Sequence, residues 1–284
     1  MLTVGSLFSG AGLCDLGLSW AGMRHQWFCE VDPFCRGVLE KHWPAIPMYN
    51  DVRALKGANL PAVDVLCGGF PCQDVSSAGK RKGIRDGSRS SLWYEYVRLI
   101  GEIRPKYAIV ENVRGLLSCG IEDVLQDLAD IRYDAEWEVL PAASLGAPHH
   151  RERVFIVAYP CGLFRGGEHR ILLPLKRMLG NDKQPWRIFD WLGIRFDRAR
   201  KTSALEVYRG PVLCRVDDGR ADGLDGPDPL PDRRDKLARV DLTTARAWIP
   251  RLKALGNGIT PQQAYAIAAC VLEAEGIAAK PMPR

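Results

Sequence analysis

Several features that would place a protein in a special class are missing from this sequence. No uninterrupted apolar run approaches the roughly 18 residues that a membrane span requires. The first residues, MLTVGSLF, run directly into a strand pattern, without the basic segment or cleavage site of a secretory signal. No internal repeat is present. These absences predict a cytoplasmic protein that has no membrane partner.

Paired cysteines of the Cys-x-x-Cys type are also missing, although the chain has nine cysteines. The number is odd and several of these cysteines lie in apolar runs, which argues against a disulfide framework and against a zinc site. His149 and His150 have no cysteine or acid at ligand spacing. The sequence therefore predicts a reduced protein without a bound metal.

What is present is an ordinary globular composition with an uneven distribution of charge. The chain has 284 residues, 46% of them hydrophobic, which is enough for one sizeable core or one core with a small second domain. The net charge is +5, but residues 160–201 hold ten Lys and Arg against four Asp and Glu. Residues 202–251 hold nine of each. The basic segment is suited to an anionic partner.

Apolar strand patterns alternate with helical periodicity up to residue 159, which predicts an α/β domain with a mainly parallel sheet. After Pro160 the regular pattern stops, and it returns only in a C-terminal helix pattern. We expect a domain at 1–159, a small irregular domain at 160–250 and a returning segment at 251–284. Strands are expected at 3–8, 26–30, 63–67, 107–111, 134–140 and 154–159, and helices at 12–21, 33–42, 92–103, 122–131 and 261–276.

Chemically distinctive residues follow several of the expected strands, at the sheet edge where open α/β folds bind ligands. The first is the turn in 8-FSGAGLCDLG-17, whose glycines allow close backbone approach but lack the Gly-x-Gly-x-x-Gly spacing of a dinucleotide site. Glu30 is placed to accept both hydroxyls of a ribose, and Asp51 to accept from an adenine amino group. For the turn, the alternative is a glycine turn with no ligand; either acid, taken alone, would be a surface charge.

The stretch 68-GGFPCQDVSSAGKRKG-83 places a single thiol on a loop framed by glycine and proline, ahead of a basic arm. A cysteine at a strand end near positive charge has a lowered pKa and acts as a nucleophile. A buried structural cysteine needs no such frame, so Cys72 is the predicted nucleophile. The residues suited to hold phosphates are Ser76, Lys80, Arg81, Lys82 and Arg89; the alternative for them is a solvated basic loop.

Two further motifs indicate proton chemistry. Glu111, in 111-ENV-113, ends an apolar strand, and burial there raises a carboxyl pKa and suits it to donate a proton. Arg151 and Arg153 are two residues apart as the next strand begins, so their side chains point to the same side. For the last motif, 256-GNGITP-261, the alternative to a functional role is a turn that starts a helix.

Taken in order, these motifs resemble the cytosine-C5 DNA methyltransferase family over residues 3–159 and 251–275. The most specific part is Gly68 to Gln73 together with Ser76. The resemblance implies a Rossmann-like, doubly wound α/β sheet, S-adenosylmethionine as the cofactor, double-stranded DNA as the partner, and a target-recognition role for 160–250. It also implies a monomer, either paired with a restriction endonuclease or solitary or phage-borne in a bacterial cell.

The family also implies a role for each matching residue. Cys72 is the nucleophile and Glu111 the acid at cytosine N3, with Arg153 and Arg151 steadying the base. The residues expected at the cofactor are Phe8, Ser9, Gly10, Gly12, Leu13, Glu30, Val31, Asp51, Val52, Pro71, Leu92, Asn257 and Ile259. Those expected at DNA are Gln73, Ser76, Lys80, Arg81, Lys82 and Arg89.

Three departures from the family pattern are visible. His149 stands where the family usually has glutamine, Gly258 where Ser or Ala is commoner, and 241–252 barely matches the segment that joins the lobes. The same catalytic set serves tRNA methyltransferases, which leaves RNA open as the substrate, and a carboxylated donor is open as well. A non-catalytic DNA-binding protein is the alternative of a different class, and the intact Cys72, Glu111 and Arg153 argue against it.

Overall fold

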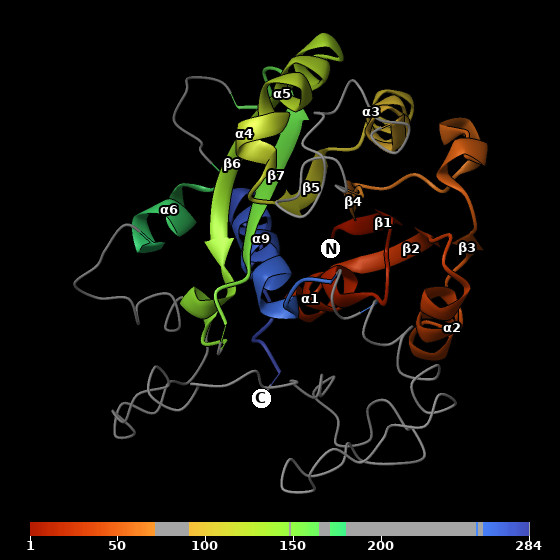
Figure 1. The fold of residues 1–284 in the computed structure, drawn as a ribbon, viewed down its shortest axis with the longest axis horizontal. Coiled ribbons are helices and arrows are strands. Elements are labelled where there is room, and N and C mark those ends of the chain that lie inside the picture. The colour runs from red at the N-terminus through yellow and green to blue at the C-terminus, as the bar shows by residue number, and fades with distance from the viewer. Residues whose placement is uncertain (72–90, 148, 165–170, 180–253, 255–257, 284) are drawn as a thin grey trace, which may run out of the picture.

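The computed structural model describes residues 1–71, 91–147, 149–164, 171–179, 254 and 258–283. Its centre is a seven-stranded sheet with the order β3-β2-β1-β4-β5-β7-β6 (Figure 1). The strands are β1 (Thr3–Leu7), β2 (Arg24–Cys29), β3 (Met48–Tyr49), β4 (Val65–Gly69), β5 (Tyr107–Val113), β6 (Tyr133–Pro141) and β7 (Glu152–Pro160).

The sheet is parallel from β3 to β5 and antiparallel where β7 joins β5 and β6 joins β7. This confirms the expected α/β class and mainly parallel sheet. The chain order places the carboxyl ends of the five parallel strands along one edge. Because β7 runs the other way, its first residues lie at that same edge, where Val113 of β5 pairs with Arg153.

Each expected helix in the catalytic region is present within one or two residues of its expected bounds. The helices are α1 (Leu13–Ala21), α2 (Pro33–His42), α3 (Ser91–Ile103), α4 (Leu116–Cys119), α5 (Ile121–Asp130), α6 (Leu173–Leu179) and α9 (Pro261–Ala274), with single 3-10 turns η1 (Val52–Ala54), η2 (Gly57–Asn59) and η3 (Ala142–Leu145). Asp32 caps α2 by accepting from the N–H groups of Phe34 and Cys35, and Pro33 follows it. Local sequence signals therefore fix where α2 begins.

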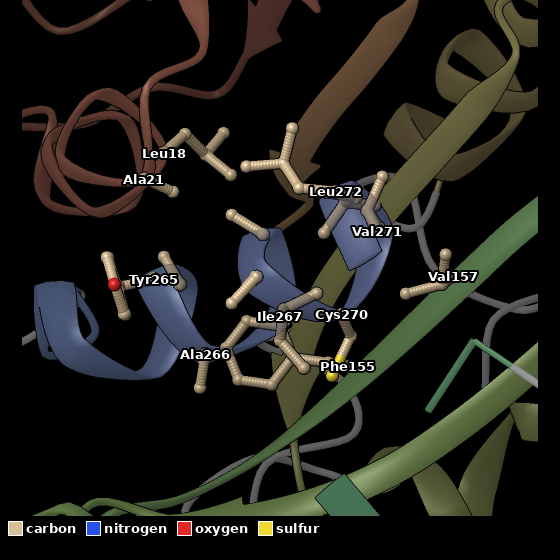
Figure 2. Close-up of a cluster of buried hydrophobic side chains, with 14 of the residues drawn as sticks. Leu18, Ala21, Phe155, Val157, Tyr265, Ala266, Ile267, Cys270, Val271 and Leu272 are labelled. Carbon is tan, nitrogen blue, oxygen red and sulfur yellow. The ribbon is translucent and has the colours of Figure 1, made fainter. Parts of the chain in front are cut away.

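Two apolar cores cover the two faces of the sheet. One contains residues of α1, α6 and α9 with the strand residues that face them, including Phe155 and Val157 of β7 (Figure 2). The other contains residues of α3 and α5, with Trp93 and Tyr96 fully buried. Helices on both faces are the arrangement called doubly wound.

Helices α1 and α9 pack against each other and lie side by side (Figure 1). A Cβ on Gly17 of α1 would be 2.2 Å from the carbonyl oxygen of Pro261 and 2.7 Å from the Cβ of Ala264. Only glycine allows this approach. The α9 segment is thus an integral part of the core that also contains Leu2 and Val4, near the start of the chain.

Some elements were not expected from the sequence. Strand β5 extends two residues beyond Glu111, β3 and α4 form where no element was expected, and α6 forms within the segment expected to be irregular. Leu172 and Leu175, at α6, are buried in the same core as α9. The division of the chain at 159 and 250 stays a prediction, since residues 180–253 lie outside the described part.

No helix in the described part of the chain has the length and apolar character to cross a membrane. The described cysteines form no disulfide with one another.

Candidate active site

The turn between β1 and α1 is built on left-handed backbone. The angle φ is +53° at Phe8, +56° at Gly10 and +77° at Gly12. A Cβ on Gly12 would lie 2.8 Å from the ring of Trp43, so a larger residue does not fit. The Gly12 N–H donates to the carbonyl of Ser9 at 2.9 Å and closes the turn. The predicted glycine turn therefore exists, with its backbone at the carboxyl end of β1.

Glu30 directly follows β2, and its carboxylate lies between two loops. One oxygen accepts from the N–H of Gly10 and the other from the N–H of Asp32, both at 2.7 Å. Glu30 is only 8% exposed, whereas its neighbour Val31 is 68% exposed. A carboxylate has about four acceptor positions, so these two bonds leave capacity on both oxygens for further donors such as ribose hydroxyls.

Asp51 follows β3, at the next strand end. It caps η1 by accepting from the N–H of Arg53 at 3.0 Å and pairs with the Arg53 guanidinium at 2.7 Å. These hydrogen bonds lower the pKa of Asp51. The side chain of Val52 is buried in the core with Trp93. Asp51 therefore lies at the surface, where the guanidinium of Arg53, which the sequence reasoning did not consider, would compete with a ligand for its carboxylate. Val52 mainly supports the turn from the core.

The end of β4 requires both of its glycines. A Cβ on Gly68 would be 2.4 Å from the carbonyl oxygen of Leu7, and one on Gly69 would be 2.2 Å from Oε2 of Glu111. Phe70 is buried against Trp93, with ring centroids 5.2 Å apart. The strand thus ends beside Glu111 and leads into the exposed Pro71. The predictions for Cys72, Gln73, Ser76, Lys80, Arg81, Lys82 and Arg89 lie outside the described residues.

Glu111 pairs across the sheet with Gly69, and its carboxylate contacts Arg153. The distance from Arg153 Nε to Glu111 Oε1 is 3.0 Å, and both side chains are mostly buried. Burial raises the pKa of Glu111 to about 7, although the charges of Arg153 and Arg151 act to lower it. Near neutral pH this carboxyl is therefore present in both its protonated and ionised forms, as a proton donor requires.

The two arginines have different contacts. Arg153 lies within β7 and faces Glu111, while Arg151 precedes the strand with a left-handed φ of +32°. The Arg151 guanidinium donates to the carbonyl of Gly258, in the segment that leads to α9. The arginine pair therefore links Glu111 on one side to the C-terminal segment on the other.

Asn112 is a residue whose role the sequence reasoning missed. It is 3% exposed, donates from Nδ2 to the carbonyl of Phe70 at 3.3 Å, and accepts from the N–H of Val113 at 2.8 Å. It thereby fixes the backbone two residues before Cys72. Its place in the Glu-Asn-Val motif was the available signal, but nothing in the sequence showed what it would touch.

A buried ion pair beneath the glycine turn was also missed. His25 Nε2 lies 3.0 Å from Asp15 Oδ1, and both residues are nearly inaccessible. Burial acts to lower the pKa of His25, but hydrogen bonds with Asp15 and Cys67 outweigh it and raise that pKa to about 9. The pair fastens α1 to β2. No group of three or more potential metal ligands occurs in the part of the chain that the structure describes.

Three of the residues expected at the cofactor have side chains that pack against other apolar residues of the protein. Leu92 lies against the α3 core that also receives Phe8, and Ile259 is 5% exposed in the α9 core. Leu13 meets the C-terminal segment, since a Cβ on Gly258 would be 2.3 Å from its Cδ1. Gly258 is thereby held close to the glycine turn. The prediction for Asn257 lies outside the described residues.

Comparison with known proteins shows one matching family model, described as C-5 cytosine-specific DNA methylase, over residues 2–167. The chain is 37% identical over 158 residues to the type II methyltransferase M.FnuDI of Fusobacterium nucleatum, covering 54% of this chain and 46% of that protein. It is 37% identical over 168 residues to M2.BsuMI of Bacillus subtilis, covering 55% and 42%. With M.AquIA of Picosynechococcus it shares 34% over 178 residues, covering 55% and 71%. The chain thus spans less than half the length of the first two relatives.

Proposed function

Because this chain belongs to the C-5 cytosine-specific DNA methylase family, we propose that it is a DNA (cytosine-5-)-methyltransferase. It transfers the methyl group of S-adenosylmethionine to carbon 5 of a cytosine in double-stranded DNA. The type II methyltransferases that resemble it support this activity.

The observation that carries the proposal is the Glu111–Arg153 pair beside Gly69. A carboxyl whose pKa is about 7 faces a guanidinium at 3.0 Å, at the end of the strand that leads to Cys72. Gly69 leaves the space that the carboxylate occupies. An acid and a cation at the strand end that leads to a nucleophilic cysteine are what addition to a pyrimidine ring requires.

Cytosine carbon 5 is a poor nucleophile until the ring is activated. The Cys72 thiolate adds to carbon 6, and the electron pair of the carbon 5–carbon 6 double bond shifts into the ring. Glu111 donates its proton at N3, and Arg153 stabilises the charge that develops on the base. Carbon 5 then takes up the methyl group, which bound S-adenosylmethionine supplies as an electrophile. Loss of the carbon 5 proton to water re-forms the double bond and releases the Cys72 thiolate, and the N3 proton returns to Glu111.

The residues at the ends of β1 to β3 fit the proposed cofactor. Glu30 retains acceptor capacity for ribose hydroxyls, and Val31 offers an exposed apolar surface next to it. The left-handed turn at Phe8 to Gly12 brings the backbone close. Asp51 can accept an adenine amino group if the guanidinium of Arg53 shares its carboxylate. Exposure of a β-branched side chain to 68% is costly in isolation, and an adenine ring would cover it.

The chemistry also constrains the DNA. A stacked base is inaccessible to Cys72 and Glu111, so the target cytosine must flip out of the helix, at a cost of a few kcal/mol. We assign phosphate contacts to the basic arm at 76–89 and target recognition to 160–250, whose basic half supplies salt-dependent binding. We further propose a monomeric, cytoplasmic enzyme in a bacterial cell, since its relatives are type II methyltransferases of bacteria, and a cognate restriction endonuclease as its partner.

The proposal is tested by expressing the chain in a bacterial strain free of cytosine methylation and sequencing cytosine modification at single-base resolution. Cys72→Ala serves as the control, because it removes the thiol and leaves the cofactor residues in place. Modified cytosines in one short sequence context, absent from the control, are expected.

An unmodified genome in cells that contain folded protein would contradict the proposal for DNA. A radiolabelled transfer assay on tRNA would then test the related RNA activity. Methylation that persists in Cys72→Ala would contradict the nucleophile assignment while leaving the reaction intact.

A further inference from the structure

Two ion pairs cross the same two strands, β5 and β7, at the carboxyl edge of the sheet. The inner pair joins Glu111 to Arg153 at 3.0 Å, and these side chains are 15% and 13% exposed. The outer pair joins Arg114 to Glu152 at 2.7 Å, and these side chains are 62% and 34% exposed. The strands last pair at Val113 and Arg153, so the outer pair lies one residue further along. Within one step of the ladder, the ion pairs therefore change from buried to exposed.

The contact with Glu152 occupies only one nitrogen of the Arg114 guanidinium. Nη1 donates to both carboxylate oxygens, at 2.8 Å and 2.7 Å. Arg53, by contrast, uses both Nε and Nη2 on the carboxylate of Asp51. Nε and Nη2 of Arg114 make no hydrogen bond with any residue in the described part of the chain. These two parallel donors match two oxygens of a phosphate, and exposed ion pairs add little to stability.

The place of this guanidinium relative to Glu111 fits the path of a DNA strand. In the proposed reaction the base meets Glu111, and it arrives from beyond the carboxyl ends of the strands. A flipped base turns inwards about its own backbone, so the sugar and the phosphates stay further out than the base. Arg114 is three residues after Glu111, which is about 10 Å along the strand direction. It is therefore at the outer level, where the phosphates pass.

The other described cations beside Glu111 have different contacts. Arg153 meets the Glu111 carboxylate, and the guanidinium of Arg151 donates to the carbonyl of Gly258. Burial and the charge of Arg151 lower the pKa of His149, so this imidazole is neutral at pH 7. Arg114 combines a permanent charge, an exposed side chain and two donors that no described residue occupies.

We propose that Arg114 binds a backbone phosphate of the DNA strand that carries the target cytosine. This inference rests on the proposed function and adds a phosphate contact to those assigned to the basic arm. Glu152 holds the guanidinium beside the strand end, and Nε and Nη2 donate to two phosphate oxygens. The contact carries no sequence information, because every nucleotide presents the same phosphate. It fixes the strand while the base is out of the helix.

The test compares Arg114→Gln, Arg114→Lys and Arg24→Gln in the full-length chain. Arg24 is exposed at the start of β2, at the opposite edge of the sheet, so its variant controls for the loss of one positive charge. Fluorescence anisotropy measures binding to a duplex that contains the methylated context and to an unrelated duplex of the same length. Each titration is repeated over a series of salt concentrations, with S-adenosylhomocysteine present.

Arg24→Gln is expected to bind as the native protein does. For Arg114→Gln the dissociation constant should rise about 5- to 30-fold on both duplexes, the effect of a lost charged hydrogen bond. The slope of log affinity against log salt should become shallower by about 0.9, the value of one phosphate contact. Arg114→Lys should keep the native slope but bind more weakly, since lysine retains the charge and lacks the paired donors. The single-turnover rate at saturating DNA should stay near the native value.

Arg114→Gln protein that binds both duplexes with the affinity and slope of Arg24→Gln would overturn the inference. If the native protein still methylates DNA, the proposed function stands. Weaker binding to the methylated context alone would also overturn the inference, because it would assign Arg114 to base recognition. Native protein that binds neither duplex would contradict the proposed DNA substrate and the inference together.

Should Arg114→Gln fail to fold, Arg114→Met replaces it, since methionine keeps an aliphatic stem and removes the charge. Failure of both variants to fold would assign Arg114 a structural role and would overturn the inference.

Discussion

Two glutamates at the same edge of the sheet, Glu30 and Glu111, differ in the groups that contact their carboxylates. Glu30 follows β2 and accepts from two backbone N–H groups at 2.7 Å. Glu111 lies near the end of β5 and faces a side-chain guanidinium at 3.0 Å, with no backbone donor at its carboxylate among the contacts the structure describes. Both are largely buried. The same residue type is therefore held as an acceptor in one place and has, in the other, the raised pKa that suits the proposed proton donor.

The difference teaches that burial alone does not decide what a carboxyl does. Backbone N–H groups are fixed and cannot be withdrawn, so they hold Glu30 as an acceptor. At Glu111, burial prevails over the two arginine charges and raises its pKa to about 7. Arg153 contacts the carboxylate directly, while Arg151 is held by the carbonyl of Gly258 in the segment that leads to α9.

The largest expected effect is the loss of activity when Glu111, rather than Glu30, is replaced. Glu111→Gln keeps the shape of the side chain but cannot transfer a proton, and general acid catalysis contributes about 10²–10⁴-fold. Single-turnover methyl transfer should fall by that factor, while the dissociation constant for S-adenosylmethionine in calorimetry stays near the native value. A rate within threefold of native would remove Glu111 from the mechanism.

Gly69→Ala should have the next largest effect on the rate of methyl transfer. Its Cβ would lie 2.2 Å from Glu111 Oε2, so the carboxylate must move, and a misplacement of about 1 Å can cost about 100-fold in rate. Gly37→Ala, in α2, is the matched control because nothing lies within 4 Å of its Cβ. The control should retain activity and gain up to about 1 kcal/mol of stability in urea unfolding. Equal rates for the two variants would show that Glu111 tolerates displacement.

Glu30→Ala is expected to weaken the binding of S-adenosylmethionine rather than to slow methyl transfer. Losing a charged hydrogen-bond acceptor costs about 1–3 kcal/mol of binding free energy. The dissociation constant for S-adenosylmethionine should therefore rise about 5- to 150-fold. The rate at saturating cofactor should change much less. Calorimetry measures the first quantity and single-turnover kinetics the second. An unchanged dissociation constant would mean that the ribose contact is made elsewhere.

The smallest and most specific expected difference is in the pH dependence of the rate, compared between the Glu30 and Glu111 variants. In the proposed mechanism protonated Glu111 is the active form, so the rate of a single turnover should fall as the pH rises through about 7, by about tenfold per pH unit above it. Glu30→Ala should keep this limb of the profile when the cofactor is saturating, and Glu111→Gln should lose it. A limb that persists in Glu111→Gln would belong to another group.

Sequence reasoning predicted the parts of the molecule that local signals encode. The β1–α1 turn, the capped start of α2 and the position of Glu30 and Glu111 near strand ends follow from glycines, capping residues and apolar runs, and the structure confirms these elements. The antiparallel direction of β7 is not encoded in its own residues. It nevertheless decides that Arg153 meets Glu111.

Contacts between distant segments were beyond the reach of the sequence. Gln263 was expected only to lie within a helix pattern, yet it touches residues 112 and 123 positions away. Arg53 was not considered, although it occupies the carboxylate of Asp51. Polar pairs such as Asp15 with His25 belong to no motif and form only when the backbone brings them together. Periodicity reports which face of an element is buried, but not which partner it meets.

The packing of α9 against α1 has a consequence for how the protein is made. The two helices lie about 240 residues apart in sequence, and Gly17 fits directly against Pro261. At about 5–20 residues per second, a ribosome needs roughly 10–50 s to proceed from one helix to the other. Until α9 is synthesised, the apolar face that includes Val4, Val65 and Ile109 has no α9 to cover it. The nascent chain is therefore a natural client for chaperones, and this core is completed only after α9 has been synthesised.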